Sequence, residues 1–199
     1  MSLNNLLPYD GEVVYVPDFL SATIAANLYL TLHKNILWER DEYLMYGKKI
    51  ITRRKVAWYG SKPFEYNYSR IKRKAHIWNK ELNEIKNLIE LETEVSFNSC
   101  LLNLYPKGID GMGWHSDDEK ELEPNAVIAS LSLGSERKFS FKHRNTKETI
   151  SLSLQNGSLL LMKGTIQKHW LHQLPKTKKN IDPRINLTFR SMIDSNEHL

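Results

Sequence analysis

The chain has 199 residues, of which 41% are hydrophobic and 26% charged, and its formal net charge is +5 at pH 7. This length allows one sizeable core, and the composition is that of an ordinary soluble globular protein. No apolar run approaches the roughly 20 residues of a membrane span, the start lacks a signal-peptide pattern, and the single cysteine, Cys100, excludes an internal disulfide.

Two helices are predicted in the first half of the chain. Over Ser21–Ile36, apolar residues recur at helical spacing after a serine, a residue type that caps helix N-termini. Over Trp78–Leu91, a second stripe of apolar residues predicts another helix. The segment between them is rich in tyrosine and basic residues and contains two short strand candidates, Lys49–Thr52 and Lys55–Tyr59.

Short strand-like runs dominate after Glu94, separated by glycine, proline and asparagine turn signals. Many short strands with alternating faces are typical of a double-sheet fold such as a jelly roll. We therefore predict an α+β fold with a double-stranded β-helix core over residues 96–199. An N-terminal extension with helices, residues 1–95, would pack on this core within one structural domain. The predicted strands are Ser96–Tyr105, Val127–Leu133, Lys138–Lys142, Thr149–Leu154, Ser158–Met162 and Arg184–Met192.

Basic residues are unevenly distributed along the chain. The sequence pI is about 9.1, and acidic residues concentrate over 81–94 and 117–123. Clusters of basic residues are typical both of a solvated basic face and of a surface that binds nucleic acid. They lie at residues 48–49, 53–55, 70–74, 142–144 and 176–179.

A His-x-Asp pair, His115 and Asp117, is the first candidate for chemistry. Residues two apart in an extended segment point the same way, so both side chains can approach one metal ion. Such a pair alone often occurs by chance and needs a third ligand, for which His169 and His172 are candidates. Two histidines and one carboxylate are the ligand set of non-haem iron(II) oxygenases. Zinc accepts the same ligands, so the ligand set leaves the metal open.

The predicted strand near the end of the chain carries two arginines on one face. Its alternate polar residues are Arg184, Asn186, Thr188 and Arg190. This face is either exposed to water or lines a pocket for an acidic ligand, because buried arginines without partners are costly. Arginine binds carboxylates through paired, charge-assisted hydrogen bonds. Asn103 and Tyr105 form a similar polar face just before the His-x-Asp pair, so a dicarboxylate beside iron would use both faces.

Taken together, these motifs resemble the AlkB family of iron(II)- and 2-oxoglutarate-dependent dioxygenases, which oxidatively dealkylate nucleobases. The resemblance covers about residues 46–192 and is closest to the branch of animal nuclear DNA-repair homologues. The motifs that carry it are NLYPKGIDGMGWHSDDE (103–119), IASLSLG (128–134), NGSLLLM (156–162), HWLHQLP (169–175) and PRINLTFR (183–190).

The resemblance implies iron(II) as the metal, with 2-oxoglutarate and O2 as cosubstrates. The iron ligands would be His115, Asp117 and His172. His169 would be structural, because the family's motif places the distal ligand just before an x-Leu-Pro element. Arg184 would pair with the far carboxylate of 2-oxoglutarate, and Arg190 would lie near its keto-acid end. The other residues that would line the cosubstrate site are Asn103, Tyr105, Asn186 and Thr188.

The same resemblance implies contacts with a base flipped out of a duplex. One tyrosine falls where relatives place an aromatic wedge, other residues match a nucleotide-recognition lid, two acids could contact an exocyclic amine, and two lysines match a loop that grips the partner strand. The plainer interpretations are strand packing for the aromatic residues and a solvated turn for the acids. The wedge would be Tyr46, and the lid residues would be Tyr59, Tyr66, Tyr68 and Ser69. The two acids are Asp118 and Glu119, and the two lysines are Lys178 and Lys179.

The predicted function is oxidative dealkylation of N-alkylated bases such as 1-methyladenine and 3-methylcytosine in DNA, with release of aldehyde, succinate and CO2. The alternatives are the same chemistry on RNA or on a protein side chain, and a non-catalytic binding module of the same fold. Basic clusters interleaved with tyrosine and tryptophan favour nucleic acid, because bases stack on aromatic rings. We expect a monomer without membrane association, cytoplasmic or, in a eukaryote, nuclear.

Overall fold

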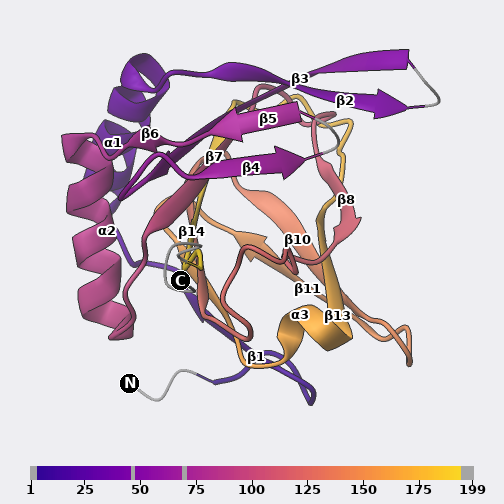
Figure 1. Cartoon of the computed structure of the whole chain (residues 1–199). Helices are drawn as coiled ribbons and strands as arrows, with labels where there is room; N and C mark the ends of the chain where they lie inside the picture. Colours follow the sequence, from indigo (N-terminus) through magenta and orange to yellow (C-terminus); the bar gives the residue numbers. More distant parts are fainter. Residues whose placement is uncertain (1–3, 46–47, 69–70, 194–199) are drawn as a thin grey trace, which may run out of the picture.

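The structure, a computed structural model, describes residues 4–45, 48–68 and 71–193, without the side chains of residues 41, 43–45, 48–49, 66–68 and 71–73. Its strands form two facing sheets that are almost entirely antiparallel (Figure 1). The main sheet has the order β1 (Glu12–Val16), β12 (Leu159–Lys163), β9 (Ile128–Gly134), β14 (Arg184–Arg190), β7 (Ser99–Tyr105), β3 (Lys48–Gly60) and β2 (Glu39–Met45), with β6 (His76–Ile77) parallel to β3.

The second sheet has the order β11 (Thr149–Leu154), β10 (Arg137–His143), β13 (Trp170–Leu174) and β8 (Met112–His115). A separate hairpin consists of β4 (Glu65–Tyr68) and β5 (Ile71–Lys74). Two facing antiparallel sheets are the architecture of a jelly roll. The predicted α+β fold with a double-stranded β-helix core is therefore confirmed.

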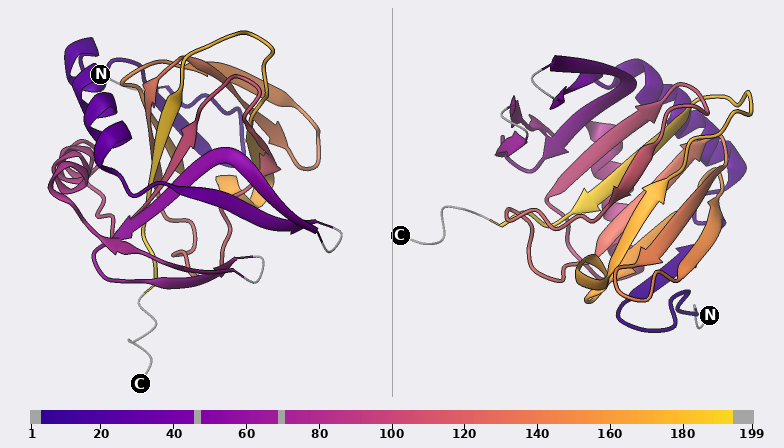
Figure 2. Two further views of the ribbon diagram at one scale, coloured as in Figure 1. Left: turned by 90° about the horizontal axis from the view of Figure 1, so that it is seen from above. Right: turned by 90° about the vertical axis from the view of Figure 1, so that its right-hand side faces the viewer.

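Helices α1 (Ala22–Asn35) and α2 (Lys80–Thr93) cover the outer face of the main sheet (Figures 1 and 2). Ser21 caps α1 by accepting the N–H of Ile24, and Asn79 caps α2 by accepting the N–H of Leu82. Their apolar stripes pack on the sheet, which removes them from water and stabilises both layers. Both predicted helices are confirmed, with ends that differ by at most two residues. In the described part of the chain, no helix is long and apolar enough to cross a membrane.

Side chains along β14 alternate between the two faces of the main sheet. Ile185, Leu187 and Phe189 are completely buried in the core beneath the helices. The residues between them point to the other face of the sheet, toward the second sheet. The same alternation holds in the neighbouring strand β7, where Cys100 and Leu102 face the helices. The main sheet therefore has an apolar outer face, and along β14 its inner face is polar.

Several strands differ from the prediction. β3 is one strand of 13 residues rather than two short ones, because β2 pairs with its first part and β7 with its last part. Pairing on both sides of the charged run Arg53–Lys55 thus keeps it within one strand despite its low apolar content: Ile51 and Lys55 both pair with β2, and the register shifts between them. The sequence did not predict β1, β2, β4, β5, β6, β8 and β13. Five of these, together with β3, lie within residues 1–95 and join the main sheet or the hairpin, so the extension and the core share one sheet.

Candidate active site

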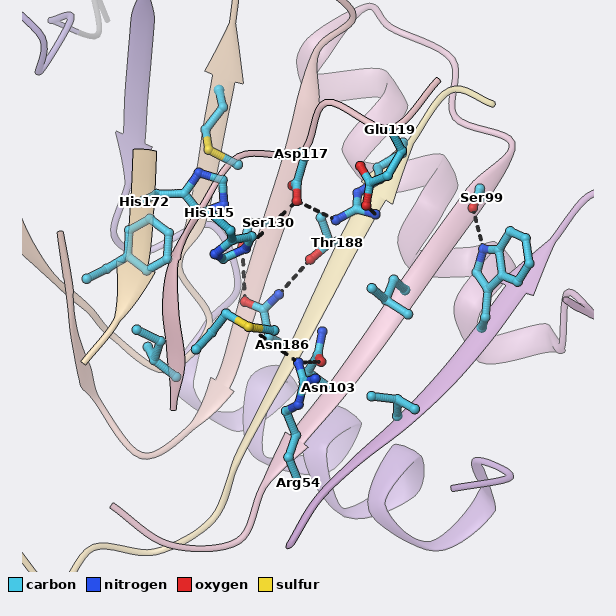
Figure 3. Close-up of a pocket in the computed structure, with 18 of the residues that line it drawn as sticks. Arg54, Ser99, Asn103, His115, Asp117, Glu119, Ser130, His172, Asn186 and Thr188 are labelled. Carbon is cyan, nitrogen blue, oxygen red and sulfur yellow. Dashed lines mark hydrogen bonds and ion pairs between the residues drawn. The ribbon is translucent and has the colours of Figure 1, made fainter. Parts of the chain in front are cut away.

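A cavity of about 210 Å³ lies between the inner faces of the two sheets. Side chains of β7, β9 and β14 form its floor, and side chains of β8, β10 and β13 form the facing wall. Strand β3 closes one side with alternate residues, Arg54, Val56 and Trp58. Figure 3 shows polar side chains from both sheets pointing into this space. One end of the cavity is polar and contains titratable groups, whereas the other end is mainly apolar.

His115, Asp117 and His172 meet at the polar end. Each offers one ligand atom, and these atoms lie within 4.8 Å of one another. His115 ends β8 and lies directly opposite His172 of β13, because the two residues are partners in the sheet register. Asp117 lies two residues beyond β8, and its Oδ1 is 3.9 Å from His115 Nε2. The structure therefore assembles the predicted triad from two strands and one loop.

The hydrogen bonds of His115 suit it to metal binding. Its Nδ1 lies 2.8 Å from the carbonyl oxygen of Gly113, which can only accept, so Nδ1 carries the proton. The neutral ring then has its free lone pair on Nε2, the atom that faces Asp117. A backbone carbonyl that holds the far nitrogen of a ligating histidine is a common feature of metal sites.

Burial and charge set the protonation of the other two triad residues. Burial lowers the pKa of His172 to about 4, and the charge of Asp117 offsets this only in part. Burial alone would raise the pKa of Asp117, but the positive charge of Arg190 and its hydrogen bond outweigh burial and hold this pKa below its usual value. A neutral imidazole and a carboxylate anion are the forms that bind a metal.

Arg190 links the triad to a second acid. Its Nη2 lies 2.9 Å from Asp117 Oδ1, and its Nη1 lies 3.8 Å from Glu119 Oε1. Burial opposes ionisation of Glu119 and raises the pKa of its carboxyl, and the positive charge of Arg190 offsets part of this rise. Within the part of the chain that the structure describes, Glu119 Oε2 and Arg190 Nε are buried without hydrogen-bond partners. Both groups therefore keep unused hydrogen-bonding capacity beside the cavity.

Arg184 is a buried cation at the far end of the polar face. It is 2% exposed, and its Nη2 donates to Ser132 Oγ at 2.8 Å and to Asn186 Oδ1 at 2.7 Å. Its guanidinium lies 5.7 Å from the centre of the Tyr105 ring, and none of the residues that the structure describes forms a hydrogen bond with its Nε. Among the described residues, no acidic side chain forms an ion pair with it. Burial accordingly lowers its pKa to about 10.

The four alternate polar residues of β14 share the cavity face, as predicted. Asn186 Nδ2 donates to Thr188 Oγ1 at 2.7 Å, and Ser130 Oγ donates to Asn186 Oδ1 at 3.0 Å. Asn103 and Tyr105 lie beside them on β7, in register with Asn186 and Arg184. All six predicted cosubstrate residues therefore line one cavity: Asn103, Tyr105, Arg184, Asn186, Thr188 and Arg190.

Other lining residues were not predicted from the sequence. Arg54 of β3 donates from Nη1 to Asn103 Oδ1 at 2.9 Å. Trp58, on the same face of β3, donates from Nε1 to Ser99 Oγ at 2.7 Å. Alternation along β3 is a signal that places both residues on one face of the strand, but only the register with β7 shows that this face is the one toward the cavity. Together with Leu101, Leu122 and Met192, Trp58 forms the apolar end of the cavity.

The structure corrects the predicted substrate role of Tyr59. Its side chain is 4% exposed, belongs to the core beneath the helices, and accepts the N–H of Leu37 through its hydroxyl oxygen. Residue 59 is odd-numbered, so its side chain lies on the face of β3 opposite to the cavity. The neighbouring Trp58 occupies the position in the cavity instead.

The other predicted substrate residues are distributed unevenly. Glu119 lines the cavity, whereas Asp118 is exposed beside it, 3.8 Å from Arg144 Nη2. Lys178 and Lys179 are exposed on the loop between β13 and β14 and do not line the cavity. Two of the remaining predicted residues, Tyr46 and Ser69, lie outside the described residues. For Tyr66 and Tyr68 only the backbone is described, and it forms part of β4.

A second group of potential ligands, Asp10, His143 and His169, lies away from the cavity. His143 Nδ1 accepts the backbone N–H of Thr146 at 3.1 Å, so the neutral ring carries its proton on Nε2. That Nε2 lies 3.2 Å from Asp10 Oδ2 and donates to it. The group is therefore a hydrogen-bonded pair that ties the start of the chain to β10. His169 lies here rather than in the cavity.

The fold and the site together define a class of protein. Residues 12–190 match the 2OG-Fe(II) oxygenase superfamily, whose members use iron(II), 2-oxoglutarate and O2. The solved structure of OsALKBH1 superposes with a TM-score of 0.65 at 19% sequence identity, covering 90% of this chain and 97% of that one. This likeness supports the jelly-roll fold, and the match to the superfamily confirms the predicted class, metal and cosubstrates.

Sequence comparison narrows the class to a family. The chain is 34% identical over 191 residues to alpha-ketoglutarate-dependent dioxygenase alkB homolog 3 of Bos taurus, covering 92% of this chain and 66% of that protein. It is 38% identical over 157 residues to DNA oxidative demethylase ALKBH2 of Mus musculus, covering 75% and 66%. It is 30% identical over 215 residues to ALKBH2 of Arabidopsis thaliana, covering 94% and 68%. The chain belongs to the AlkB family, and it spans about two thirds of these relatives' length.

The residues in the cavity fit the ligands of this class. Iron(II) needs nitrogen and carboxylate donors with open positions, and His115 Nε2, His172 and Asp117 supply such donors. 2-Oxoglutarate needs a cation for its far carboxylate. Arg184 is buried, carries an unused Nε and forms no ion pair within the described residues, so it fits an anionic ligand.

Proposed function

We propose that this protein removes alkyl groups oxidatively from N-alkylated nucleobases in DNA, such as 1-methyladenine and 3-methylcytosine. The observation that carries the proposal is a His-Asp-His triad that shares one cavity with a buried arginine lacking an acidic partner among the described residues. The relatives named as DNA oxidative demethylases support the choice of substrate. The products would be the repaired base, an aldehyde, succinate and CO2.

In this proposal the triad holds the metal and the β14 face holds the cosubstrate. His115, Asp117 and His172 are the ligands, and Arg190 keeps Asp117 ionised and in place. Arg184 pairs with the far carboxylate of 2-oxoglutarate, while Asn103 and Tyr105 supply hydrogen bonds next to it. The bound metal, with 2-oxoglutarate and O2, supplies the oxidising chemistry. Hydroxylation of the N-alkyl carbon gives a hemiaminal, which releases the aldehyde and leaves the base.

The apolar end of the cavity would receive the base. A base flipped out of a duplex is held by stacking and by contacts to its edge. Trp58 and Leu101 offer an apolar surface there, and Glu119 offers a carboxyl oxygen without a partner. Asp118, Tyr46, Tyr66, Tyr68 and Ser69 stay predicted substrate contacts. Lys178 and Lys179 would reach the phosphate backbone, since they are exposed on a neighbouring loop.

A matched demethylation assay tests the proposal. Oligonucleotides with one 1-methyladenine or 3-methylcytosine, as single-stranded DNA, duplex DNA and RNA, are incubated with iron(II), 2-oxoglutarate and O2. We expect repaired base and at least an equal amount of succinate on DNA, and neither when 2-oxoglutarate is omitted. The His115→Ala variant should lose turnover. Repair of RNA alone would move the substrate to RNA, and no repair of any oligonucleotide would refute a nucleobase substrate.

A further inference from the structure

The loop that carries Asp117 receives a hydrogen bond from a distant side chain. Asp117 lies two residues beyond the end of β8, so the sheet register does not fix its backbone. Its backbone N–H donates to Gln167 Oε1 at 2.9 Å. Gln167 is half-buried and belongs to the short helix α3 (Ile166–His169) between β12 and β13. A loop amide 50 residues away in the sequence is thus held by one side chain.

Helix α3 is itself fixed in the core. Ile166 is 1% exposed within an apolar cluster formed by residues of both sheets. Gln167 Nε2 lies 3.8 Å from Met162 Sδ, and Met162 is 2% exposed at the end of β12. The amide of Gln167 is therefore oriented, with its nitrogen toward Met162 and its oxygen toward Asp117. The chain continues from α3 directly into β13, which carries His172.

Through these contacts, the segment that begins with α3 helps to position two members of the triad, Asp117 and His172. The backbone of Asp117 is held through Gln167, and its carboxylate is held by Arg190 at 2.9 Å. His172 follows Gln167 by five residues in the same continuous segment. A carboxylate on a loop can point away from the metal unless both its backbone and its side chain are fixed, and such fixing lowers the entropy lost on binding.

We propose that Gln167 is a positioning residue for the metal site, acting through the backbone of Asp117. The inference rests on the proposed role of Asp117 as a ligand. The hydrogen bond holds the loop in the arrangement that directs the Asp117 carboxylate toward the two histidines before metal binds. Loss of an outer partner of this kind typically weakens metal affinity by about 10- to 100-fold.

Metal affinity tests the proposal without any turnover. The metal-free protein is titrated with Mn(II), and free Mn(II) is followed by electron paramagnetic resonance. Gln167→Met keeps the side-chain volume but removes the acceptor, and we expect its Kd for Mn(II) to rise at least tenfold. Gln167→Glu keeps an acceptor and should bind within a few-fold of the parent. Lys168→Ala, an exposed neighbour on α3, is the matched control and should bind as the parent does. Parental affinity in a folded Gln167→Met protein would overturn the proposal.

A second measurement needs no variant and covers the case in which Gln167→Met does not fold. Amide hydrogen exchange in the metal-free parent should show the Asp117 N–H exchanging more slowly than the N–H of Asp118, although both lie outside the strands. Equal, fast exchange of the two amides would overturn the proposal. Failure of the proposed substrate would look different, since nucleobase turnover would be absent while Mn(II) affinity still depended on residue 167.

Discussion

Arg184 lies at the bottom of the cavity, with its guanidinium between Ser132, Asn186 and the ring of Tyr105. These neighbours are neutral, so they satisfy part of its hydrogen bonding without neutralising its charge. A buried charge without a partner costs several kcal/mol in folded proteins. An anionic ligand that reaches the unused Nε would offset part of this cost, and the fold is therefore built around a ligand that carries negative charge.

Replacing Arg184 by Met should raise the KM for 2-oxoglutarate. The proposed contact with the far carboxylate is a charge-assisted hydrogen-bonded pair worth roughly 1.5–3 kcal/mol, so its loss corresponds to about a 10- to 100-fold change in KM. Succinate formation against 2-oxoglutarate concentration measures it. Lys138→Met, exposed on the outer face of β10, is the control for loss of a basic residue. An unchanged KM in Arg184→Met would place the far carboxylate elsewhere.

His172 should make the metal-free protein sensitive to acid. Its pKa is about 4 when folded, because burial disfavours the charged ring, against about 6.5 in an unfolded chain. Between these values the unfolded chain binds a proton that the folded protein does not, so stability falls as the pH falls from about 6.5 toward 4. Urea denaturation of the metal-free protein at stepped pH measures this. His172→Gln should have a shallower pH dependence, and parallel curves would contradict the assignment.

At the scale of elements, β3 pairs with different strands along its length. Its last residues pair with β7 in the main sheet, whereas its first residues form a hairpin with β2 that extends past the sheet (Figure 1). Arg54 lies where these parts meet and donates to Asn103 Oδ1. That bond turns the NH2 group of the Asn103 amide away from Arg54, which leaves it free to donate to a cosubstrate. The hairpin is thereby connected to the cosubstrate site.

Replacing Arg54 by Met should therefore affect cosubstrate binding as well as any substrate contact. Without the arginine, the Asn103 amide can rotate and present its oxygen to a carboxylate, which repels it. We expect the KM for 2-oxoglutarate to rise about 3- to 10-fold, consistent with loss of one hydrogen bond of about 1 kcal/mol. The measurement is succinate formation without nucleic acid, so that substrate binding plays no part. Asn103→Asp should give a larger rise, and an unchanged KM in Arg54→Met would contradict the connection.

Elements with a clear pattern could be predicted from the sequence. β14 alternates polar and apolar residues along its whole length, so its cavity face was predicted with the correct residues. β8 and β13 were missed, because their short runs carry the triad histidines and glycine, which interrupt any alternation. Tyr59 was assigned to the site and Trp58 was not, because the face of β3 is set by its register with β7 rather than by local sequence. Gln167 gave no signal, since its partner is a backbone amide.

At the scale of the molecule, the site joins both sheets. Two residues of the triad come from strands of the second sheet, and Asp117 comes from the loop after β8. The predicted cosubstrate residues come from β7 and β14 of the main sheet. Arg137 of β10 connects loops at one end by donating from Nη2 to the carbonyls of Gly108, Asp110 and Pro175. Ligands that bridge the sheets should therefore stabilise the whole fold and not only the site.

Adding Mn(II) and 2-oxoglutarate should raise the melting temperature. Ligand at about 100 times its Kd stabilises the folded state by about 2.7 kcal/mol, which corresponds to roughly 5 to 10 °C for a chain of this size. Differential scanning calorimetry without oxygen measures the shift. The increment from 2-oxoglutarate should be lost in Arg184→Met, while that from Mn(II) should be kept. Equal increments in parent and variant would argue against a bridging site.

Strand β14 is central in the main sheet yet follows every other described strand in the chain. During synthesis, β7 and β9 emerge well before it and are separated in the sheet by the place that it fills. Until Arg190 has left the ribosome, both strands present unpaired edges, and such edges favour aggregation. A nascent chain of this protein therefore completes its sheet and its cosubstrate face in the same event. Stalled or truncated chains that end before residue 184 should accumulate as clients of chaperones rather than as partly active enzyme.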